Sequence, residues 1–400
     1  MFGSIYSGYS GLLGFSKGLD VLSNNVANMN SPGFKSSELS FRDLVYRYGF
    51  NGSNGGNPSL QIGGGVDTSN TRIKFSQGEL RGTGNALDVA IDGNGFFVLR
   101  KDGKTFYTRA GQFNFDANDI LIDQDSGAHV AALVNGRLAD ISLAGLRISP
   151  PQATSSIVFS GNLSRGGDPH TISAITVFDA AGTSHVLSLT FTRNGTATDQ
   201  WLVEVKDENN VVIANGEIRY QGNGSPLAGF NTISFNYNPV GAPPSSITLN
   251  FGDPGSFSGS TNFSGGTTSD LKVQSLDGFG PGSLTEVTFD EQGRLLTKYS
   301  NGQNSTHEHI ALGWFTDLQH LTQVGKNLFS NDSQQTVTLD IPGNGAMGKL
   351  VPKKIELSNV ELSEQFTDMV IIQRGYQASS QIISVANEMI QQLFDIRAKR

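Results

Sequence analysis

The chain has 400 residues, of which 37% are hydrophobic and 16% charged, with 49 glycines and no cysteine. This length allows two or three domains with cores of their own, and the lack of cysteine excludes disulfides, thiol catalysis and cysteine-ligated metals. The net charge of −8, with no run of lysine or arginine, argues against nucleic acid and anionic membranes as partners.

The first twenty residues, MFGSIYSGYSGLLGFSKGLD, have neither a basic n-region nor an unbroken apolar h-region. No other stretch is long and apolar enough to span a membrane. We therefore expect no cleaved signal peptide and no membrane insertion. Two localisations fit this expectation: the cytoplasm, or export by a route that uses no cleaved signal.

Residues 1–30 predict a helix with an a/d heptad pattern. Its apolar heptad positions are Ile5, Leu12, Phe15, Leu19, Leu22 and Val26. The pattern is diluted by glycines at positions 3, 8, 11, 14 and 18, each of which weakens an isolated helix by about 1 kcal/mol relative to alanine. We expect this helix to form only when a partner packs on it.

The end of this helix, LSNNVANMNSPGFK, combines an apolar face with many asparagines. Asn24, Asn25 and Asn28 are unusual in a helix, because the amide competes for nearby backbone groups. Ser31-Pro32-Gly33 then ends the helix.

Between this helix and the C-terminal one, the sequence predicts strands and turns. Residues 31–70 are loop-rich, and residues 71–148 alternate as strands with hairpin turns at Asp92-Gly93, Asn94-Gly95 and Asp102-Gly103. The sequence pattern changes at 149–271, where two strand-turn-strand units begin. At 272–357 the pattern again resembles that of 71–148. This order predicts an outer β domain (149–271) inserted into an inner β domain (71–148 plus 272–357).

A second helix is predicted from a cap at Ser358 or Asn359 to about Arg397, with Lys399 and Arg400 suiting its C-terminal end. Gly375 interrupts it. Its heptad positions are Leu362, Gln365, Met369, Ile372, Tyr376, Ser379, Ile383, Ala386, Ile390 and Leu393. Such helices are usually ordinary core helices, but here no helical domain lies between the two. Their partners are therefore expected to be each other and then a multimer.

The predicted fold class is mainly β with terminal α-helices, in a nested multidomain chain. The N- and C-terminal helices (1–30 plus 358–400) form a coiled-coil-like domain. A loop-rich connecting segment (31–70) and two successive β-rich domains are inserted between them.

No convincing active site or cofactor site is found, so we expect a protein that is not an enzyme. A calcium loop starting at Asp123 would have Val134 where a bidentate glutamate is required. His307 and His309 could share one strand face, but a third metal ligand is missing. Polar turns and a solvated strand explain these features better, and no metal is expected.

LSNNVANMNSPGFK resembles the N-terminal signature of the bacterial flagellar rod and hook proteins, the axial family. SNVELSEQFTDMVIIQRGYQASSQIISVANEMIQQL resembles the C-terminal helix of that family. GELRGTGNALDVAIDGNGFFVLR, TRAGQFNFD and GSLTEVTFDEQGRLLTKYSNGQ are similar to its core domain. The insertion, with ITVFDAAGTSHVLSLTF followed by Trp201, resembles that of hook members and not the shorter rod members.

The resemblance implies a structural subunit whose terminal helices stack into a curved hollow tube, a universal joint between rod and filament that is needed for motility. Asn24, Asn25 and Asn28 would lie among neighbouring helices or along a wet channel, and Pro32, Gly33 and Phe34 would turn the chain outward. The implied location is extracellular, in the hook and basal body. The termini are expected to be disordered in the monomer and to fold on assembly.

The same resemblance implies the partners. They are further copies of the chain, the distal rod protein, the hook cap, the hook–filament junction protein, the hook-length control protein and the flagellar export apparatus. Two alternatives stay open: a distal rod-type protein, and a β-rich adhesin or binding protein whose helices dimerise.

Overall fold

The computed structural model describes residues 2–48, 61–195, 197–239 and 241–398. The chain forms two compact units, and the sequence of one is inserted into that of the other. Unit 1 contains Met1–Ala144, Val287–Leu296 and Thr306–Arg400, and unit 2 contains Gly145–Glu286 and Thr297–Ser305. The finer division into four domains stays a prediction.

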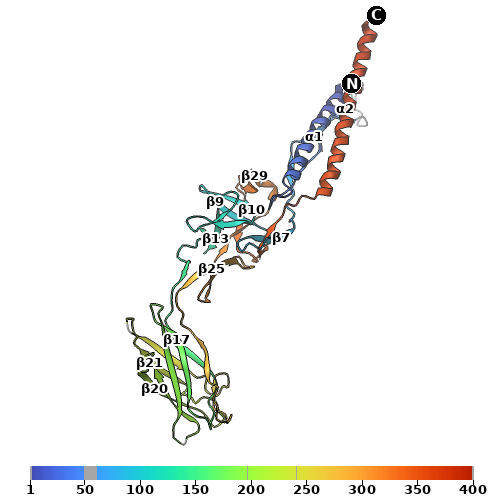
Figure 1. Ribbon diagram of the computed structural model, residues 1–400. Helices are drawn as coiled ribbons and strands as arrows, with labels where there is room; N and C mark the ends of the chain where they lie inside the picture. The colour runs from blue at the N-terminus through green and yellow to red at the C-terminus, as the bar shows by residue number, and fades with distance from the viewer. Residues whose placement is uncertain (1, 49–60, 196, 240, 399–400) are drawn as a thin grey trace. The chain divides into compact units, whose positions relative to one another are not determined.

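Two helices from opposite ends of the chain lie side by side in unit 1 (Figure 1). They are α1 (Phe2–Ala27) and α2 (Leu362–Ala398). Apart from the short 3-10 helix Leu318–His320, the regular elements between them that the structure describes are strands. The prediction of a mainly β fold with paired terminal helices is confirmed.

The details of α2 differ from the expectation in two ways. The helix begins at Leu362, after Ser358 and Asn359, because the Asn359 side chain is bonded to backbone groups of Ser36, Lys74 and Ser76 instead. Gly375 lies inside the helix without interrupting it. Lys399 and Arg400, expected at the C-terminal end, lie outside the described residues.

The strands of unit 1 are short. Those before the insertion are β1 (Ser37–Leu39), β2 (Arg42–Asp43), β3 (Tyr46–Tyr48), β4 (Gln61–Gly63), β5 (Val66–Asp67), β6 (Thr71–Ile73), β7 (Leu80–Gly82), β8 (Val89–Asp92), β9 (Phe96–Lys101), β10 (Lys104–Thr108), β11 (Phe113–Phe115), β12 (Leu121–Asp123), β13 (His129–Val134) and β14 (Arg137–Asp140). Those after it are β28 (Leu312–Phe315), β29 (Thr322–Gly325), β30 (Leu328–Ser330), β31 (Val337–Asp340), β32 (Lys349–Pro352) and β33 (Lys354–Glu356).

The centre of unit 1 is β9, which pairs with β10, β13 and β28. Its first four residues are all buried, so both of its faces are covered. On one side Phe96 meets Phe315 and Phe329 edge-on, with ring centroids 6.3 and 5.7 Å apart. These rings are part of the apolar core of unit 1.

The predicted turns around β9 have different outcomes. Asp102-Gly103 joins β9 to β10 as a two-residue hairpin with positive φ at both residues (51° and 73°), as expected. The hairpin predicted at Asp92-Gly93 and Asn94-Gly95 is wrong. The strand before these residues, β8, pairs with β32 near the C-terminus and not with β9.

The segment predicted to be loop-rich, 31–70, contains paired strands. β1 pairs with β6, β2 with β5 and β3 with β4, so the chain runs out and back as one long antiparallel ribbon. Its residues 49–60 lie outside the described residues. The ribbon lies against α1, where the Val66 amide donates to Ser10 Oγ at 3.2 Å.

Unit 2 is a sandwich of two sheets. Its strands are β15 (Ile148–Ser149), β16 (Ser156–Asn162), β17 (His170–Phe178), β18 (Ser184–Arg193), β19 (Gln200–Lys206), β20 (Val212–Arg219), β21 (Thr232–Tyr237), β22 (Ser245–Asn250), β23 (Ser260–Thr261) and β24 (Lys272–Leu276). Three strands have residues in both units: β25 (Gly282–Phe289), β26 (Arg294–Tyr299) and β27 (Asn304–Ile310).

One sheet of the sandwich has the order β17-β18-β19-β20, and the other is built on β16, which pairs with β22, β23 and β24. The two predicted strand-turn-strand units are the antiparallel pairs β17–β18 and β19–β20. Alternate residues of each strand face inward, and Phe159, Leu189 and Trp201 are fully buried between the sheets.

Candidate functional site

The two helices meet along a seam of small residues. A methyl group at Gly8, Gly11 or Gly18 of α1 would lie 3.1 Å from Ile383, 2.9 Å from Ser379 or 2.8 Å from Ile372, respectively. The numbers rise along α1 as they fall along α2, so the helices are antiparallel. The glycines that weaken an isolated α1 are therefore the residues that allow α2 to approach closely.

One large side chain crosses the same seam from α1. The ring of Phe15 lies over Gly375, where a methyl group would be 2.4 Å from the ring. The ring also lies 5.5 Å from that of Phe41 in the ribbon. Gly375, expected to interrupt α2, instead provides the space that Phe15 occupies.

The seam is rotated from the predicted heptad stripe of α1. The buried positions on the seam are Gly8, Gly11, Gly18, Leu22 and Asn25, while Gly14 is buried against Thr68 and Phe41 of the ribbon. Of the predicted assembly residues of α1, only Leu22 is buried, while Ile5, Leu12, Phe15, Leu19 and Val26 are half-buried. The stripe was predicted from large apolar residues, whereas the close contact is made by residues that have almost no side chain.

The predicted positions on α2 divide into two groups. Half-buried residues near α1 are Met369, Ile372, Ile383 and Ile390. More exposed residues are Leu362, Tyr376 and Leu393, at 39%, 39% and 50%. The polar or small heptad positions Gln365, Ser379 and Ala386 are the buried ones. The helix pair thus uses its small residues internally and leaves large apolar residues at its surface.

Asn25 fixes the base of the helix pair. Its side chain is buried, donates from Nδ2 to Gln365 Oε1 at 2.9 Å and to Ser37 O at 2.8 Å, and accepts the Ser37 amide at 3.0 Å. Asn25 was expected among neighbouring helices or along a channel, and within one chain it lies between α1 and α2, where both of its amide hydrogens are bonded. Sequence analysis missed Gln365 as its partner.

The other two asparagines lie outside this contact. Asn28 donates from Nδ2 to Asn24 O at 2.9 Å and to Asn24 Oδ1 at 3.1 Å. Asn24 is exposed and Asn28 is half-buried. These two amides therefore remain accessible from outside the helix pair.

The turn after α1 is held by the β body of unit 1. Gly33 has a φ of 69°, and its amide donates to the Glu356 carbonyl at 2.8 Å. A methyl group there would lie 2.4 Å from the Ala110 nitrogen, so only glycine fits. The Pro32 carbonyl accepts from Asn327 Nδ2 at 2.9 Å, and Phe34 is buried.

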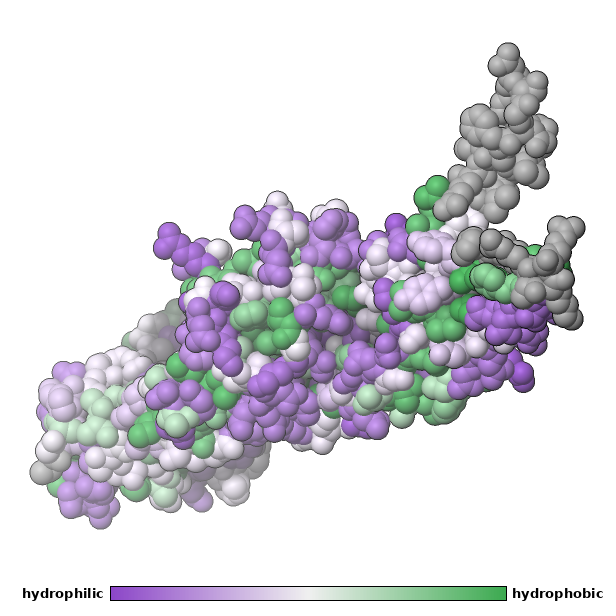
Figure 2. All heavy atoms as spheres, turned by 90° about the horizontal axis from the view of Figure 1, so that it is seen from above, coloured by the Kyte–Doolittle hydropathy of each residue, from purple (hydrophilic) through white to green (hydrophobic). Residues whose placement is uncertain are grey.

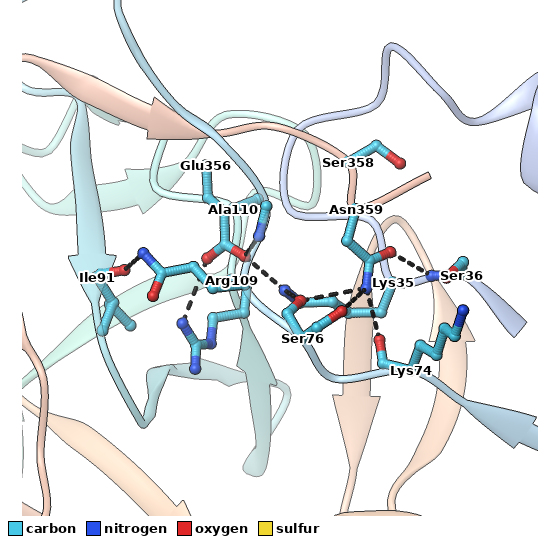
Figure 3. A network of polar contacts seen from close by, with 12 residues as sticks. Lys35, Ser36, Lys74, Ser76, Ile91, Arg109, Ala110, Glu356, Ser358 and Asn359 are labelled. Carbon is cyan, nitrogen blue, oxygen red and sulfur yellow. Dashed lines mark hydrogen bonds and ion pairs between the residues drawn. The ribbon is translucent and has the colours of Figure 1, made fainter. Parts of the chain in front are cut away.

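A buried ionic cluster follows directly in the sequence (Figure 3). Lys35 Nζ donates to Glu356 Oε1 and to the Ser76 carbonyl, and Arg109 Nη1 lies 3.3 Å from Glu356 Oε2. The side chains of Lys35 and Glu356 are fully buried, and that of Arg109 is 6% exposed. Burial lowers the pKa of Lys35 and that of Arg109, and the carboxylate of Glu356 opposes both shifts.

This cluster joins segments from both ends of the chain. Lys35 follows α1, Glu356 ends β33, and Arg109 follows β10. Beside it Asn359 accepts the Ser36 amide at 2.8 Å and donates to the Lys74 carbonyl at 2.8 Å (Figure 3). Sequence analysis missed these residues. A pairing across more than 300 positions leaves no local pattern, and the charged ends of GFK and KIE are weak signals.

The surface of the helix pair carries many large apolar residues. Those between 39% and 67% exposed are Tyr6, Tyr9, Leu13, Leu362, Phe366, Val370, Ile371, Tyr376, Ile382, Val385, Met389, Leu393, Phe394 and Ile396. On the face that Figure 2 views, hydrophobic residues lie at the surface between hydrophilic ones. A run of this length along one helix pair is typical of an interaction surface.

The residues considered for metal binding are placed in ordinary strands and turns. Asp123 is buried, and its Oδ2 accepts the Ser126 amide at 2.9 Å. Burial raises the pKa of this carboxyl. His307 and His309 lie in β27. Across residues 2–48, 61–195, 197–239 and 241–398, no group of three or more His, Asp or Glu side chains is arranged to hold a metal ion.

Membrane-spanning helices were also sought. Neither α1 nor α2, as far as their residues are described, has a stretch apolar and long enough to cross a bilayer.

Three family models match the chain in order. They are "Flagella basal body rod protein" over residues 5–35, "Flagellar hook protein FlgE/F/G D1 domain" over 90–162 and "Flagellar basal body rod FlgEFG protein C-terminal" over 352–396. The first covers most of α1 and the turn to Lys35. The last begins just before Glu356 and covers most of α2.

The chain is also similar to curated proteins over nearly its whole length. It is 28% identical to the flagellar hook protein FlgE of Borreliella burgdorferi and to that of Treponema pallidum, over 99% of this chain and 100% of each relative. It is 27% identical to that of Escherichia coli, over 97% of this chain and 98% of the relative. A crystal structure of Helicobacter pylori flagellar hook protein FlgE2 matches with a TM-score of 0.48 and 13% identity, over 70% of this chain and all of that one.

Proposed function

We infer that this chain, which belongs to the flagellar rod and hook protein family, is a structural subunit of the bacterial flagellar hook. The observation that carries this inference is the helix pair. Its own seam is closed by small and polar residues, yet its outer faces leave large apolar side chains such as Phe394 uncovered. Such faces are covered when many copies pack side by side.

The energetics favour a polymer built on these helices. Burying one large apolar side chain contributes about 1.5–3 kcal/mol. Fourteen such side chains on the helix pair are at least 39% exposed, so neighbouring copies can offset an ordering cost of about 4–15 kcal/mol. The half-buried heptad residues, among them Ile5, Leu12, Leu19 and Val26, add to the contact area. Contacts that are not self-complementary then generate a helical filament that does not close.

In this polymer the helices form a curved hollow tube that acts as a universal joint between rod and filament. We propose that Asn24, which is exposed, and Asn28, which bonds to it, lie along neighbouring helices or the channel. There they form hydrogen bonds without adding charge to the path of exported protein. The helices hold the subunits together, and the β units slide past one another on weak polar contacts as the tube bends.

The proposed location is outside the cell, in the hook above the basal body, after export by the flagellar apparatus without a cleaved signal. The proposed partners are other copies, the distal rod protein, the hook cap, the hook–filament junction protein and the hook-length control protein. The role is structural, with no catalytic step.

The alternatives are a distal rod protein and a β-rich adhesin. Relatives named as hook proteins align over 97–99% of this chain, a range that includes unit 2, and this favours the hook over the rod. Exposed apolar residues run along most of α2 and the first half of α1, which is more than a simple helix dimer would cover, and this favours the polymer over the adhesin.

Immunogold electron microscopy of intact cells, with antibody against residues 151–268, tests the proposal. Gold on a short curved segment between envelope and filament is expected. Labelling only after removal of the outer membrane would indicate a rod protein. Labelling of the cell surface away from any appendage would support an adhesin and contradict both axial roles.

A further inference from the structure

β17 (His170–Phe178) is an outer strand of the sandwich in unit 2. Its sheet has the order β17-β18-β19-β20, so among the described strands β17 has a partner on one side only. The main-chain groups on the open side of such a strand can bond to a strand of another molecule. We refer to this open side as the β17 edge.

The β17 edge is interrupted by a β-bulge. Ile172 and Ile175 pair with positions 189 and 187 of β18, so the two residues between them, Ser173 and Ala174, lie opposite one residue of β18. Ala174 has a φ of 63°, in the left-handed region that residues with a side chain rarely adopt. A bulge of this kind breaks the regular alternation of main-chain groups along a strand.

The bulge divides the outward-facing main-chain groups into two sets. The Phe178 amide donates to Thr154 Oγ1 and the Phe178 carbonyl accepts the Thr154 amide, both at 2.9 Å, so Phe178 faces away from β18. Phe178, Thr176 and Thr171 pair with positions 184, 186 and 190 of β18, and because the direction alternates along β18, all three face outward. Thr171 and Thr176 are an odd number of positions apart, so a straight partner strand cannot bond to both.

The ends of the β17 edge are covered by other segments of unit 2. Thr154 occupies one end, and at the other end His170 Nε2 lies 2.7 Å from the Leu271 carbonyl oxygen. Between these ends Ser173 and Ala174 are exposed. The bulge therefore lies in the exposed part of the edge.

The packing of the core does not require the extra residue. Ile175 and Val177 are buried in the core of the sandwich, and Ile172 packs against that core. Without Ala174, these three side chains would follow the alternation of a regular strand, in which every second residue faces inward. The unfavourable φ at Ala174 thus has another purpose than filling the core.

Two other outer strands of the sandwich carry the same feature. In β20, Ile213 is the extra residue opposite positions 205 and 206 of β19, and in β24, Gln274 is the extra residue opposite positions 158 and 159 of β16. The extra residue lies on the outer strand in both pairs, as it does in β17. Bulges on outer strands are one way in which β proteins avoid pairing with other molecules.

We propose that the bulge at Ser173 and Ala174 prevents the β17 edge of one copy from pairing with the β17 edge of a second copy. Two identical edges related by a two-fold axis are antiparallel, which is the pairing that a regular β17 would allow. The consequence for the hook rests on the proposed function, whereas the protection of the edge does not. Outer units can slide past one another only when no ladder of main-chain hydrogen bonds joins them.

Deleting Ala174 tests the proposal, because Thr171, Ser173 and Thr176 then face outward at every second residue. Ser173→Cys places a thiol on the edge of a chain that has no natural cysteine, and a short thiol-reactive cross-linker detects pairing in dilute protein. The deletion is expected to raise the yield of cross-linked dimer by about tenfold over Ser173→Cys alone, since an unbroken edge adds several hydrogen bonds.

Two further variants show whether the edge itself is responsible. Thr192→Cys is the matched control, because Thr192 is exposed on the inner strand β18, and its cross-linking yield should be the same with and without Ala174. In the deleted chain, Thr176→Lys adds a charge to the new edge and should return the Ser173→Cys yield to that of the undeleted chain.

The fold of unit 2 is followed through the fluorescence of Trp201 in a Trp314→Phe background. If the chain without Ala174 does not unfold cooperatively, deletion of Ser173 with Ala174→Cys as the thiol replaces it, since this also shortens the bulge by one residue. Failure of both deleted chains to fold would show that the sandwich needs the bulge and would overturn its role in edge protection.

The other outcomes separate the edge from the proposed function. A folded deletion variant with no rise in cross-linking, or with a rise that Thr176→Lys does not reverse, would overturn the proposal and leave the structural role in the hook intact. The expected cross-linking, in a protein that immunogold labelling does not find on the hook, would support the protection of the edge and overturn the proposed function.

Discussion

Unit 2 and the terminal helix pair bury very different residues. In unit 2 the two sheets enclose Phe159, Leu189, Trp201 and Leu249 with no exposed surface. In the helix pair, glycines of α1 meet Ile372, Ser379 and Ile383 of α2, and Asn25 bonds to Gln365, while many other large apolar residues stay exposed. The sandwich buries its large apolar residues within one chain, whereas the helix pair leaves many of its own exposed.

The helices are attached to the strands of unit 1 by polar contacts as well. This attachment depends on the buried Lys35–Glu356–Arg109 cluster and on the hydrogen bonds of Asn359. Hydrogen bonds and ion pairs require a particular geometry, whereas the apolar contacts in the core of unit 2 do not. These polar contacts tie the residues after α1 and before α2 to the strands of unit 1.

The largest effect is expected inside unit 2. Phe159→Ala removes a ring that stacks on Phe251 with centroids 4.8 Å apart and should destabilise unit 2 by about 3–5 kcal/mol. The chain has two tryptophans, Trp201 in unit 2 and Trp314 in unit 1. Urea unfolding followed by fluorescence in a Trp314→Phe background therefore reports unit 2.

The matched control is Phe257→Ala, because Phe257 is 54% exposed in the same unit. Its effect should stay within about 0.5 kcal/mol. Equal losses from the two variants would contradict the view that the sandwich is complete on its own.

Removing the carboxylate of the ionic cluster is the next test. Glu356→Gln leaves Lys35 and Arg109 buried without a counter-charge and should cost unit 1 about 3–5 kcal/mol. The exposed Lys74–Glu364 pair supplies the control, since Glu364→Gln should cost about 1 kcal/mol or less. The fluorescence of Trp314 in a Trp201→Phe background reports the free energy of unfolding of unit 1 in both variants. Similar losses from Glu356→Gln and Glu364→Gln would show that the cluster does not anchor the helices.

A smaller effect distinguishes the asparagines of α1. Asn25→Ala leaves buried partners on Gln365 and Ser37 unsatisfied and should cost about 1–3 kcal/mol, while Asn24→Ala, at an exposed position, should cost little. Hydrogen exchange of the Ser37 amide, which donates to Asn25, should speed up only in the first variant. Equal exchange rates of the Ser37 amide in both variants would show that Asn25 does not stabilise the base of the seam.

Much of the fold could be predicted from local pattern. The terminal helices, the hairpin at Asp102-Gly103 and the paired strands β17–β18 and β19–β20 follow from periodicity and turn chemistry over a few residues. The hairpin predicted at Asp92-Gly93 failed because turn residues indicate a change of direction and not which strands pair. The actual partner of β8 is β32, about 260 positions away.

The candidate site was harder to predict for a physical reason. Hydrophobic periodicity weighs large side chains, so it found Ile372 and Ile383 of the seam and missed the glycines that they contact. Lys35 and Glu356 were missed because their pairing depends on how unit 1 closes around them.

The smallest expected effect on the single chain occurs at the tip of α2. Phe394 is 64% exposed, so Phe394→Ala should change the stability of unit 1 by no more than about 0.5 kcal/mol. In a polymer that buries this ring, the same change should cost up to about 3 kcal/mol per copy and raise the concentration needed for assembly. Sedimentation of polymerised protein measures that concentration, and Val186→Ala, at a 41% exposed position of unit 2, is the control. A loss of stability in the single chain would mean that α2 depends on Phe394 before assembly, and unchanged assembly would mean that its tip remains uncovered in the polymer.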